Sequence, residues 1–381
     1  MLAGNSKMIT SSENIRAELI NYIIYLQLMT SLSTEKYNVI RNPEMKTQLI
    51  ECYELIEKID CDSLLMKGEY IKKNFQVLAD YFLKRYPLKK TINEIATEFN
   101  SFFKEGNNPF STGIEYGWLE SVMDIRAKRW PKDLPYQTKI GLGHHASYAN
   151  NEDEFLLRDS FYTFLKAKQS YKNLLKLRDK LKEKEDKIES NFNKTAYDQL
   201  NLLKFNVSAY SRLTIISFYS FIECFVNTVG YNFYYRNKDI LNERESEMLM
   251  GRKKDRFLQL EYKLEKFPTI IREDKKQIIF IKDEKQIKEP FKTFFTEYKN
   301  LRDASVHYAP LKEKIWYSPI DWKTKSEEFK NLSMDLALSF WKACYPESDG
   351  PEYLGKLAQK IHLELAEKRL HIDEEILINN S

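Results

Sequence analysis

Apolar residues recur every three or four positions through most of this chain, and short polar stretches separate the segments that carry the pattern. Such spacing places apolar side chains on one face of a helix. On this basis the main predicted helices cover residues 13–31, 62–86, 154–189, 196–235 and 329–345. The sequence therefore predicts an all-α fold.

Residues that favour helix ends support this assignment. Ser, Thr, Asp or Asn followed three positions later by Glu is typical of a helix start, as is Pro in the first turn, whereas Gly favours the end. The signals are Thr10 with Glu13, Asn42 before Pro43, Thr91 with Glu94, and Gly106.

Two regions depart from the helical pattern. Residues 106–152 are rich in glycine, proline and tryptophan, which predicts a long irregular section. It contains adjacent His144 and His145, but without a nearby carboxylate or cysteine at ligand spacing a solvated loop is favoured over a metal site. Residues 269–283 hold two apolar runs around a charged stretch, which is compatible with one short β-hairpin.

A polar break at residues 191–195 suggests a division into a helical N-terminal domain, 1–195, and a second helical domain, 196–381. After the break, residues 215–227 are apolar on nearly every side, so this part of the helix should be buried on several faces. Glu223 in such surroundings requires a partner. Two compatible interpretations are a carboxylate held by an internal arginine or lysine and a site residue that positions the arginine.

Composition limits the function without naming it. The chain has 381 residues, of which 30% are charged, and a net charge of +4. This net charge is too small to indicate a nucleic-acid-binding protein. Cys52, Cys61, Cys224 and Cys344 are scattered, which favours a reducing, cytoplasmic setting with thiols acting as small apolar groups. The apolar run at 19–29 is too short to span a bilayer and lacks a basic flank, so we expect no membrane association.

The strongest candidates for catalytic residues are Arg302, Asp303 and His307. They lie near the end of a predicted helix that must stop at Pro310. Arginine offers a planar donor fork for phosphate, and histidine exchanges protons near neutral pH. Only five histidines occur in the chain. The pair could act on a phosphodiester, or it could satisfy a polar contact between helices.

A basic cluster, Arg252, Lys253, Lys254 and Arg256, precedes a segment with helical apolar spacing from Phe257 to Phe267. It could contact a phosphate backbone, although a solvated helix face is the commoner origin of such a cluster and is favoured here. Tyr308, directly after His307, is a further candidate substrate contact.

The order of segments adds a resemblance. Four segments follow one another in this order: "SFYSFIECFVNTV", "RKKDRFLQLEYKLEKFP", "PFKTFFTEYKNLRDASVHYAP" and "SMDLALSFWKACYPESDGPEYL". Within the third, "NLRDASVH" fits an Arg-x4–6-His motif. Residues 196–355 thus resemble the HEPN superfamily of helical bundles, whereas the first 195 residues resemble no known family. The resemblance implies catalytic roles for Arg302 and His307, an accessory role for Asp303 and, more loosely, a role for Glu223.

Members with this motif are typically endoribonucleases that need neither metal nor cofactor, with a composite site in a homodimer. Positions five apart on an ideal helix diverge by about 140°, which independently favours a shared site. We expect a cytoplasmic ribonuclease that cleaves RNA as a toxin or antiphage effector. A regulatory protein or the N-terminal domain would restrain its activity. The alternative is a non-catalytic helical module for dimerisation or for binding RNA or nucleotide.

Overall fold

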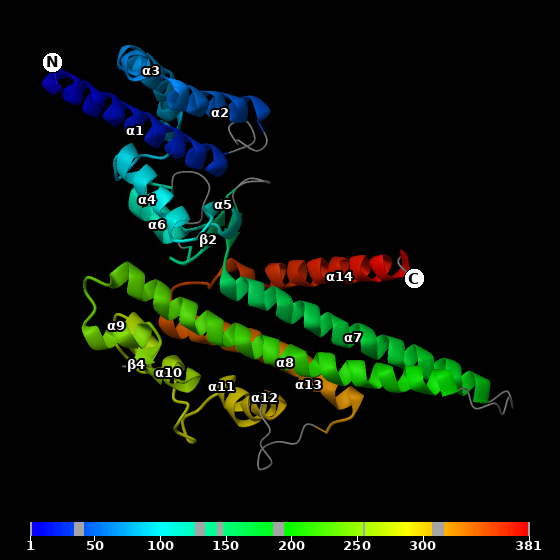
Figure 1. Cartoon of the computed structure of the whole chain (residues 1–381). Helices are drawn as coiled ribbons and strands as arrows, with labels where there is room; N and C mark the ends of the chain where they lie inside the picture. The colour runs from blue at the N-terminus through cyan, green and yellow to red at the C-terminus, as the bar shows by residue number, and fades with distance from the viewer. Residues whose placement is uncertain are drawn as a thin grey trace. The chain divides into compact units, whose positions relative to one another are not determined.

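The chain is described by a computed structural model over residues 2–33, 42–125, 134–142, 148–185, 194–253, 256–306 and 316–379. These residues are mainly helical, which confirms the all-α fold class. They form two compact units, Met1–Asn151 and Glu152–Ser381 (Figure 1), and each has its own apolar core.

Four helices build most of the first unit: α1 (Leu2–Leu32), α2 (Pro43–Lys58), α3 (Cys61–Arg85) and α4 (Ile92–Lys104). The Asn42 side chain accepts a hydrogen bond from the Met45 amide at 3.1 Å, and Thr91 forms a capping box with Glu94, so both predicted starts are confirmed. The start predicted at Thr10 is wrong because α1 already runs through it. A capping signal marks a start only where the preceding residues leave the helix.

The section predicted to be irregular contains short elements. They are α5 (Pro109–Thr112), β1 (Ile114–Glu115), α6 (Tyr116–Val122), β2 (Lys139–Gly141) and β3 (Tyr148–Asn150). The strands form an antiparallel sheet in the order β1-β2-β3, with Ile114 opposite Ile140. Gly113, at a φ of 75°, turns the chain from α5 into β1 and leaves no room for a side chain against the Ile140 carbonyl. His144 and His145 lie outside the described residues.

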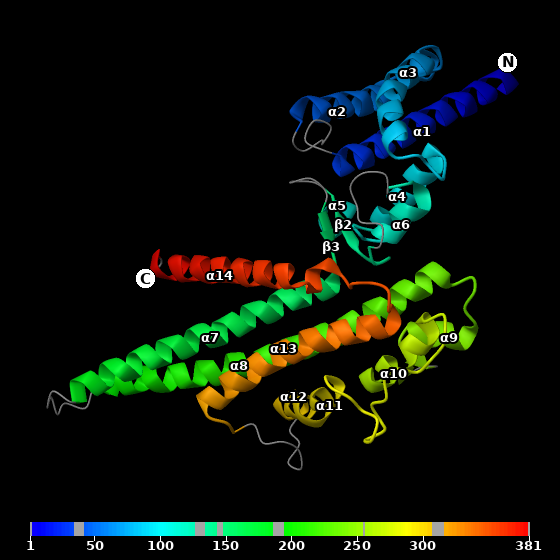
Figure 2. The same ribbon diagram turned by 180° about the vertical axis from the view of Figure 1, so that it is seen from behind.

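Long helices dominate the second unit: α7 (Glu152–Glu185), α8 (Lys194–Asn237), α13 (Pro319–Cys344) and α14 (Lys356–Asn379). Helices α7, α8 and α13 run side by side in both views (Figure 2). The Phe161 ring of α7 lies 5.6 Å from the Phe218 ring of α8, centroid to centroid. Because α7 packs into this core, the units divide between Asn151 and Glu152 and not at the predicted 195–196.

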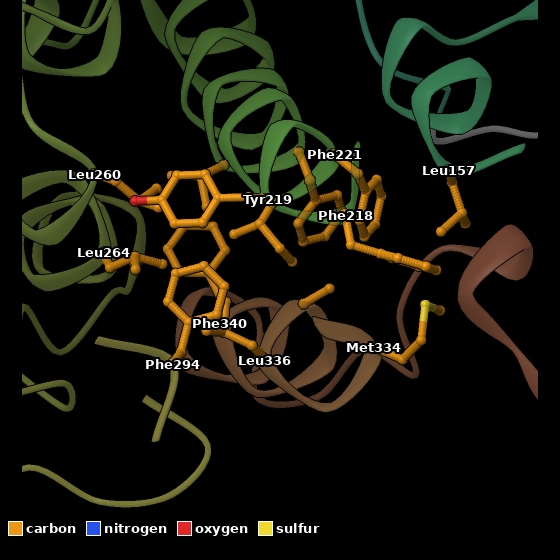
Figure 3. Close-up of a cluster of buried hydrophobic side chains, with 14 of the residues drawn as sticks. Leu157, Phe218, Tyr219, Phe221, Leu260, Leu264, Phe294, Met334, Leu336 and Phe340 are labelled. Carbon is orange, nitrogen blue, oxygen red and sulfur yellow. The ribbon is translucent and has the colours of Figure 1, made fainter. Parts of the chain in front are cut away.

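The middle of α8 is buried, as its sequence predicts, within a cluster that includes Phe218, Phe294 and Phe340 (Figure 3). By length and composition alone α8 could cross a membrane, but 61% of its apolar window is buried inside the protein, as is typical of a core helix. Among the cysteines, Cys344 is buried and Cys52 and Cys224 are half-buried.

The hairpin in this unit lies earlier than predicted. After α9 (Glu243–Leu249), β4 (Arg252–Lys253) pairs with β5 (Arg256–Phe257), and α10 (Leu260–Ile271) follows. Arg252, Lys253 and Arg256 are therefore on strands, so the assignment of these residues to a helix face is wrong. The hairpin predicted at 269–283 is also wrong, because α10 continues through Pro268 and no strand follows among the described residues up to 290.

Candidate active site

Arg302 lies on α12 (Lys299–Val306), the last part of a continuous helical segment that starts with α11 (Phe291–Thr293). Between them is a π turn, Phe294–Tyr298. A π turn adds one residue to a helical turn and so rotates the positions that follow. Phe294 and Tyr298 both stack on Phe329 of α13, at centroid distances of 5.6 and 4.5 Å. The direction of Arg302 is thus set by buried aromatic packing.

The Arg302 side chain lies against α8. Its guanidinium carbon is 3.9 Å from the centroid of the Tyr219 ring, and its Nη2 is 3.5 Å from Oε1 of Glu223. Its Nη1 is 2.9 Å from Oδ1 of the neighbouring Asp303. The Arg302 guanidinium is therefore fixed by the Tyr219 ring and by the carboxylates of Glu223 and Asp303, while 21% of the Arg302 side chain stays exposed. The predicted contact of Glu223 with an arginine is confirmed, which fits both interpretations of Glu223.

Further polar groups continue along the same face of α8. Tyr219, Glu223 and Asn227 are spaced four residues apart, and Lys263 of α10 donates to Oδ1 of Asn227 at 2.7 Å. We call these four residues together with Arg302 the polar seam. Its two cationic groups come from different elements and converge on one helix.

Burial and charge act in opposite directions within the polar seam. Burial raises the pKa of the Glu223 carboxyl, while Arg302 and Lys263 oppose this rise. Burial likewise lowers the pKa of the Lys263 ammonium, and Glu223 partly restores it. Glu223 keeps 46% of its side chain exposed, so water screens these interactions. The Arg302 guanidinium carries five N–H groups and stays partly exposed, so it is the group of the seam that an anion arriving from solvent would meet.

The basic hairpin begins next to the polar seam. Gly251, at a φ of 75°, precedes β4, and a Cβ on it would lie 3.3 Å from Nζ of Lys263. Arg252, Lys253 and Arg256 are exposed, whereas Lys254 lies outside the described residues. Three of the four basic residues predicted to contact RNA are thus exposed to solvent. They lie on a strand pair that starts beside Lys263.

His307 and Tyr308 also lie outside the described residues, which resume at Trp316. Helix α12 ends at Val306, directly before His307. The convergence of Arg302 and His307 therefore stays a prediction.

Sequence reasoning missed three members of the polar seam. Tyr219 and Asn227 could have been found, because each is four residues from Glu223 and so shares its helix face. Lys263 carried no signal of its own among the charged residues of its segment. Its role depends on α10 crossing α8 at Asn227, which is a tertiary contact.

Across the described ranges, no three His, Cys, Asp or Glu side chains gather where they could hold a metal ion. Comparisons with protein-family models, with curated proteins and with solved structures found no match to this chain. Its function must therefore be argued from the residues of the polar seam.

Proposed function

We propose that the chain is an endoribonuclease of HEPN type that needs no metal ion. The observation that carries the proposal is the seating of Arg302: a partly exposed guanidinium on the Tyr219 ring, held by Glu223 and Asp303, five residues before a histidine. Phosphoryl transfer requires a fixed positive group where negative charge develops. A guanidinium held on several sides meets this requirement better than a mobile one.

In the proposed reaction, Arg302 binds the non-bridging oxygens of the scissile phosphate. The 2′-oxygen attacks phosphorus and the bond from phosphorus to the 5′-oxygen breaks. His307 either takes the proton of the 2′-hydroxyl or gives one to the departing 5′-oxygen, and water exchanges the other proton. The products are a 2′,3′-cyclic phosphate and a free 5′-hydroxyl. DNA lacks the attacking group and should not be cut. Glu223 and Asp303 act as positioning residues for the guanidinium.

A second copy of the chain completes the proposed site. On a regular helix Arg302 and His307 would diverge, so His307 from one protomer would work beside Arg302 of the other. A cytoplasmic toxin or antiphage effector, restrained by the first unit or by a regulatory protein, is the biological role that fits such a ribonuclease.

The test is incubation of the purified chain with total RNA in EDTA, followed by sequencing of the RNA ends. Wild type should leave 2′,3′-cyclic phosphate ends, and Arg302→Ala and His307→Ala should lower cleavage by at least about a hundredfold. Arg369→Ala is a matched control, because Arg369 also lies over a tyrosine ring, that of Tyr162, near an aspartate. Full cleavage by either site variant, or loss of cleavage in the control, would overturn the proposal.

One observation favours a non-catalytic binding module. Both terminal nitrogens of Arg302 already face carboxylates within one chain, as in arginines that hold helices together. A module of this kind would bind RNA without cutting it. RNA binding by wild type together with intact RNA ends would select this second function.

A further inference from the structure

The β4–β5 hairpin displays an aromatic ring that the core does not use. Phe257 is 78% exposed, although phenylalanine usually buries its ring in folded proteins. Arg252 is its partner across the strands, and the guanidinium carbon of Arg252 lies 5.5 Å from the ring centroid. The ring is thus held beside a cation on one side while most of its surface stays open.

The second cross-strand pair sets two cations against each other. Lys253 lies directly opposite Arg256, and both side chains are exposed. Like charges at opposed positions destabilise a strand pair, and a two-stranded hairpin is marginally stable in water. A bound anion would relieve the repulsion. The hairpin therefore combines an open ring with a pair of cations that would be more stable with an anion between them.

The position of the hairpin connects it to the polar seam. The Leu258 amide donates to the Gly251 carbonyl at 2.9 Å and closes the strand pair at its base. Gly251 abuts Lys263, whose charge acts on Glu223, the partner of Arg302. The base of the hairpin therefore adjoins the polar seam that contains Arg302.

We propose that this hairpin is a binding site for single-stranded RNA, an inference that rests on the proposed ribonuclease function for the choice of RNA. One unpaired base stacks on the open face of Phe257, while Arg252, Lys253 and Arg256 contact the adjacent phosphates. Bases inside a duplex are already stacked and cannot reach the ring. The hairpin thereby selects single strands and feeds them to Arg302. An anionic membrane surface is the less favoured ligand, because a single ring offers little apolar area to insert.

The test measures the binding of a fluorescent oligouridine, alone or annealed to its complement, to the full-length chain carrying His307→Ala, in EDTA. The single strand should bind more tightly than the duplex. Phe257→Ala and Phe257→Leu should both weaken binding by about fivefold or more, and Phe257→Trp should retain it. Arg256→Ala should lower the slope of log Kd against log salt by about 0.7. Tyr70→Ala, which removes an exposed ring in the other unit, should change nothing.

Equal affinity for duplex and single strand, or wild-type affinity in Phe257→Ala, would overturn the hairpin site. Binding to vesicles of phosphatidylcholine and phosphatidylserine that Phe257→Leu retains would also overturn it, since a leucine can enter lipid but cannot stack on a base. The cleavage assay separates this result from the ribonuclease proposal. Cleavage by wild type with no effect of Phe257→Ala refutes only the hairpin, whereas Phe257-dependent binding without cleavage refutes only the enzyme.

Discussion

At the scale of single residues, the activity proposed for the polar seam would depend on the shape of the Arg302 side chain as well as on its charge. Its guanidinium stacks on Tyr219 and reaches Glu223 and Asp303 at the same time. An ammonium group is a compact point charge that cannot reproduce this planar fork. Geometry, and not only electrostatics, should therefore limit activity.

Arg302→Lys tests this requirement. We expect at least a tenfold lower kcat for RNA cleavage. The unfolding free energy should fall by only about 1 kcal/mol, because lysine keeps the positive charge beside Glu223 and Asp303 and loses mainly the contact with the Tyr219 ring. Cleavage assays and thermal unfolding check the two expectations, and Arg369→Lys serves as the control. Unchanged kcat in Arg302→Lys would show that positive charge alone suffices.

A second residue-scale prediction concerns Asp153, which is only 1% exposed. Its carboxylate accepts hydrogen bonds from the Tyr353 hydroxyl and the Glu154 amide, but burial outweighs them and raises its pKa from 3.8 to about 6. The folded state thus binds this proton more tightly than the unfolded chain. Stability should therefore fall as pH rises from about 4 to about 6 and level off above, by up to about 3 kcal/mol.

Asp153→Asn should remove this pH dependence, because an amide does not titrate and the Tyr353 hydroxyl can rotate to accept from it. The difference in unfolding free energy between variant and wild type should favour the variant increasingly from pH 4 to pH 7. Denaturant unfolding at several pH values measures it, and other titrating groups such as His362 cancel in the difference. The exposed Asp159→Asn should show no such trend. A flat difference for Asp153→Asn would refute the assignment.

Sequence reasoning correctly expected a basic partner for Glu223, and Arg302 is that partner, although 46% of the Glu223 side chain is exposed and the helix is less apolar there than the sequence indicated. It could not find Lys263 or the stacking of Arg302 on Tyr219, because both contacts join helices far apart in sequence. The local sequence pattern predicts that the Glu223 carboxylate needs a partner, whereas only the packing of the helices shows which residues contact it.

At the scale of elements, the apolar spacing from Phe257 to Phe267 correctly indicated α10 but wrongly extended a helix into the basic cluster. Gly251 at positive φ turns the chain there into a hairpin. The π turn at Phe294–Tyr298 was also missed, since five residues barely change the apparent period. Both features are local departures from regular geometry beside the polar seam, where a functional site often places them.

The crossing of α8 and α10 supplies an element-scale prediction. A Cβ at Gly230 would lie 2.3 Å from Cε2 of Phe267 and 3.0 Å from the Leu249 carbonyl oxygen. Gly230→Ala should therefore destabilise the fold by about 1–3 kcal/mol, despite the better helix propensity of alanine.

The double variant Gly230→Ala/Phe267→Leu provides the control. Removing the ring makes room for the new methyl group, so the double variant should be more stable than the sum of the two single effects. Chemical denaturation of all four proteins gives the coupling free energy. Simple additivity would show that the helices do not meet closely at Gly230.

At the scale of the whole molecule, the sequence indicated two units but misplaced their boundary. The polar break at residues 191–195 separates two helices, α7 and α8, that pack against each other. A polar stretch looks the same whether it links domains or closes a helical hairpin. The two cases differ only in whether the apolar face of α7 packs against α8. The sequence of α7 alone does not show which helix that face contacts.

The last prediction follows from this packing and compares two fragments. Residues 152–381 contain the whole second core, so we expect a cooperative unfolding transition and a near-ultraviolet dichroism signal from fixed aromatic rings. Residues 196–381 lack α7 and with it four side chains of the second core cluster, Leu157, Phe161, Phe164 and Leu165. Their burial contributes roughly 6–12 kcal/mol, which is comparable to the net stability of a domain.

The shorter fragment also loses Asp153, the acceptor for Tyr353, and the Phe161 ring that stacks on His362 of α14. It should therefore keep helical far-ultraviolet dichroism but lose the near-ultraviolet signal and bind a hydrophobic dye. Adding Phe161→Ala to residues 152–381 gives an intermediate case, because this change opens a cavity without removing the helix. If residues 196–381 unfolded as cooperatively as residues 152–381, α7 would be an accessory helix and the predicted boundary at 195–196 would be restored.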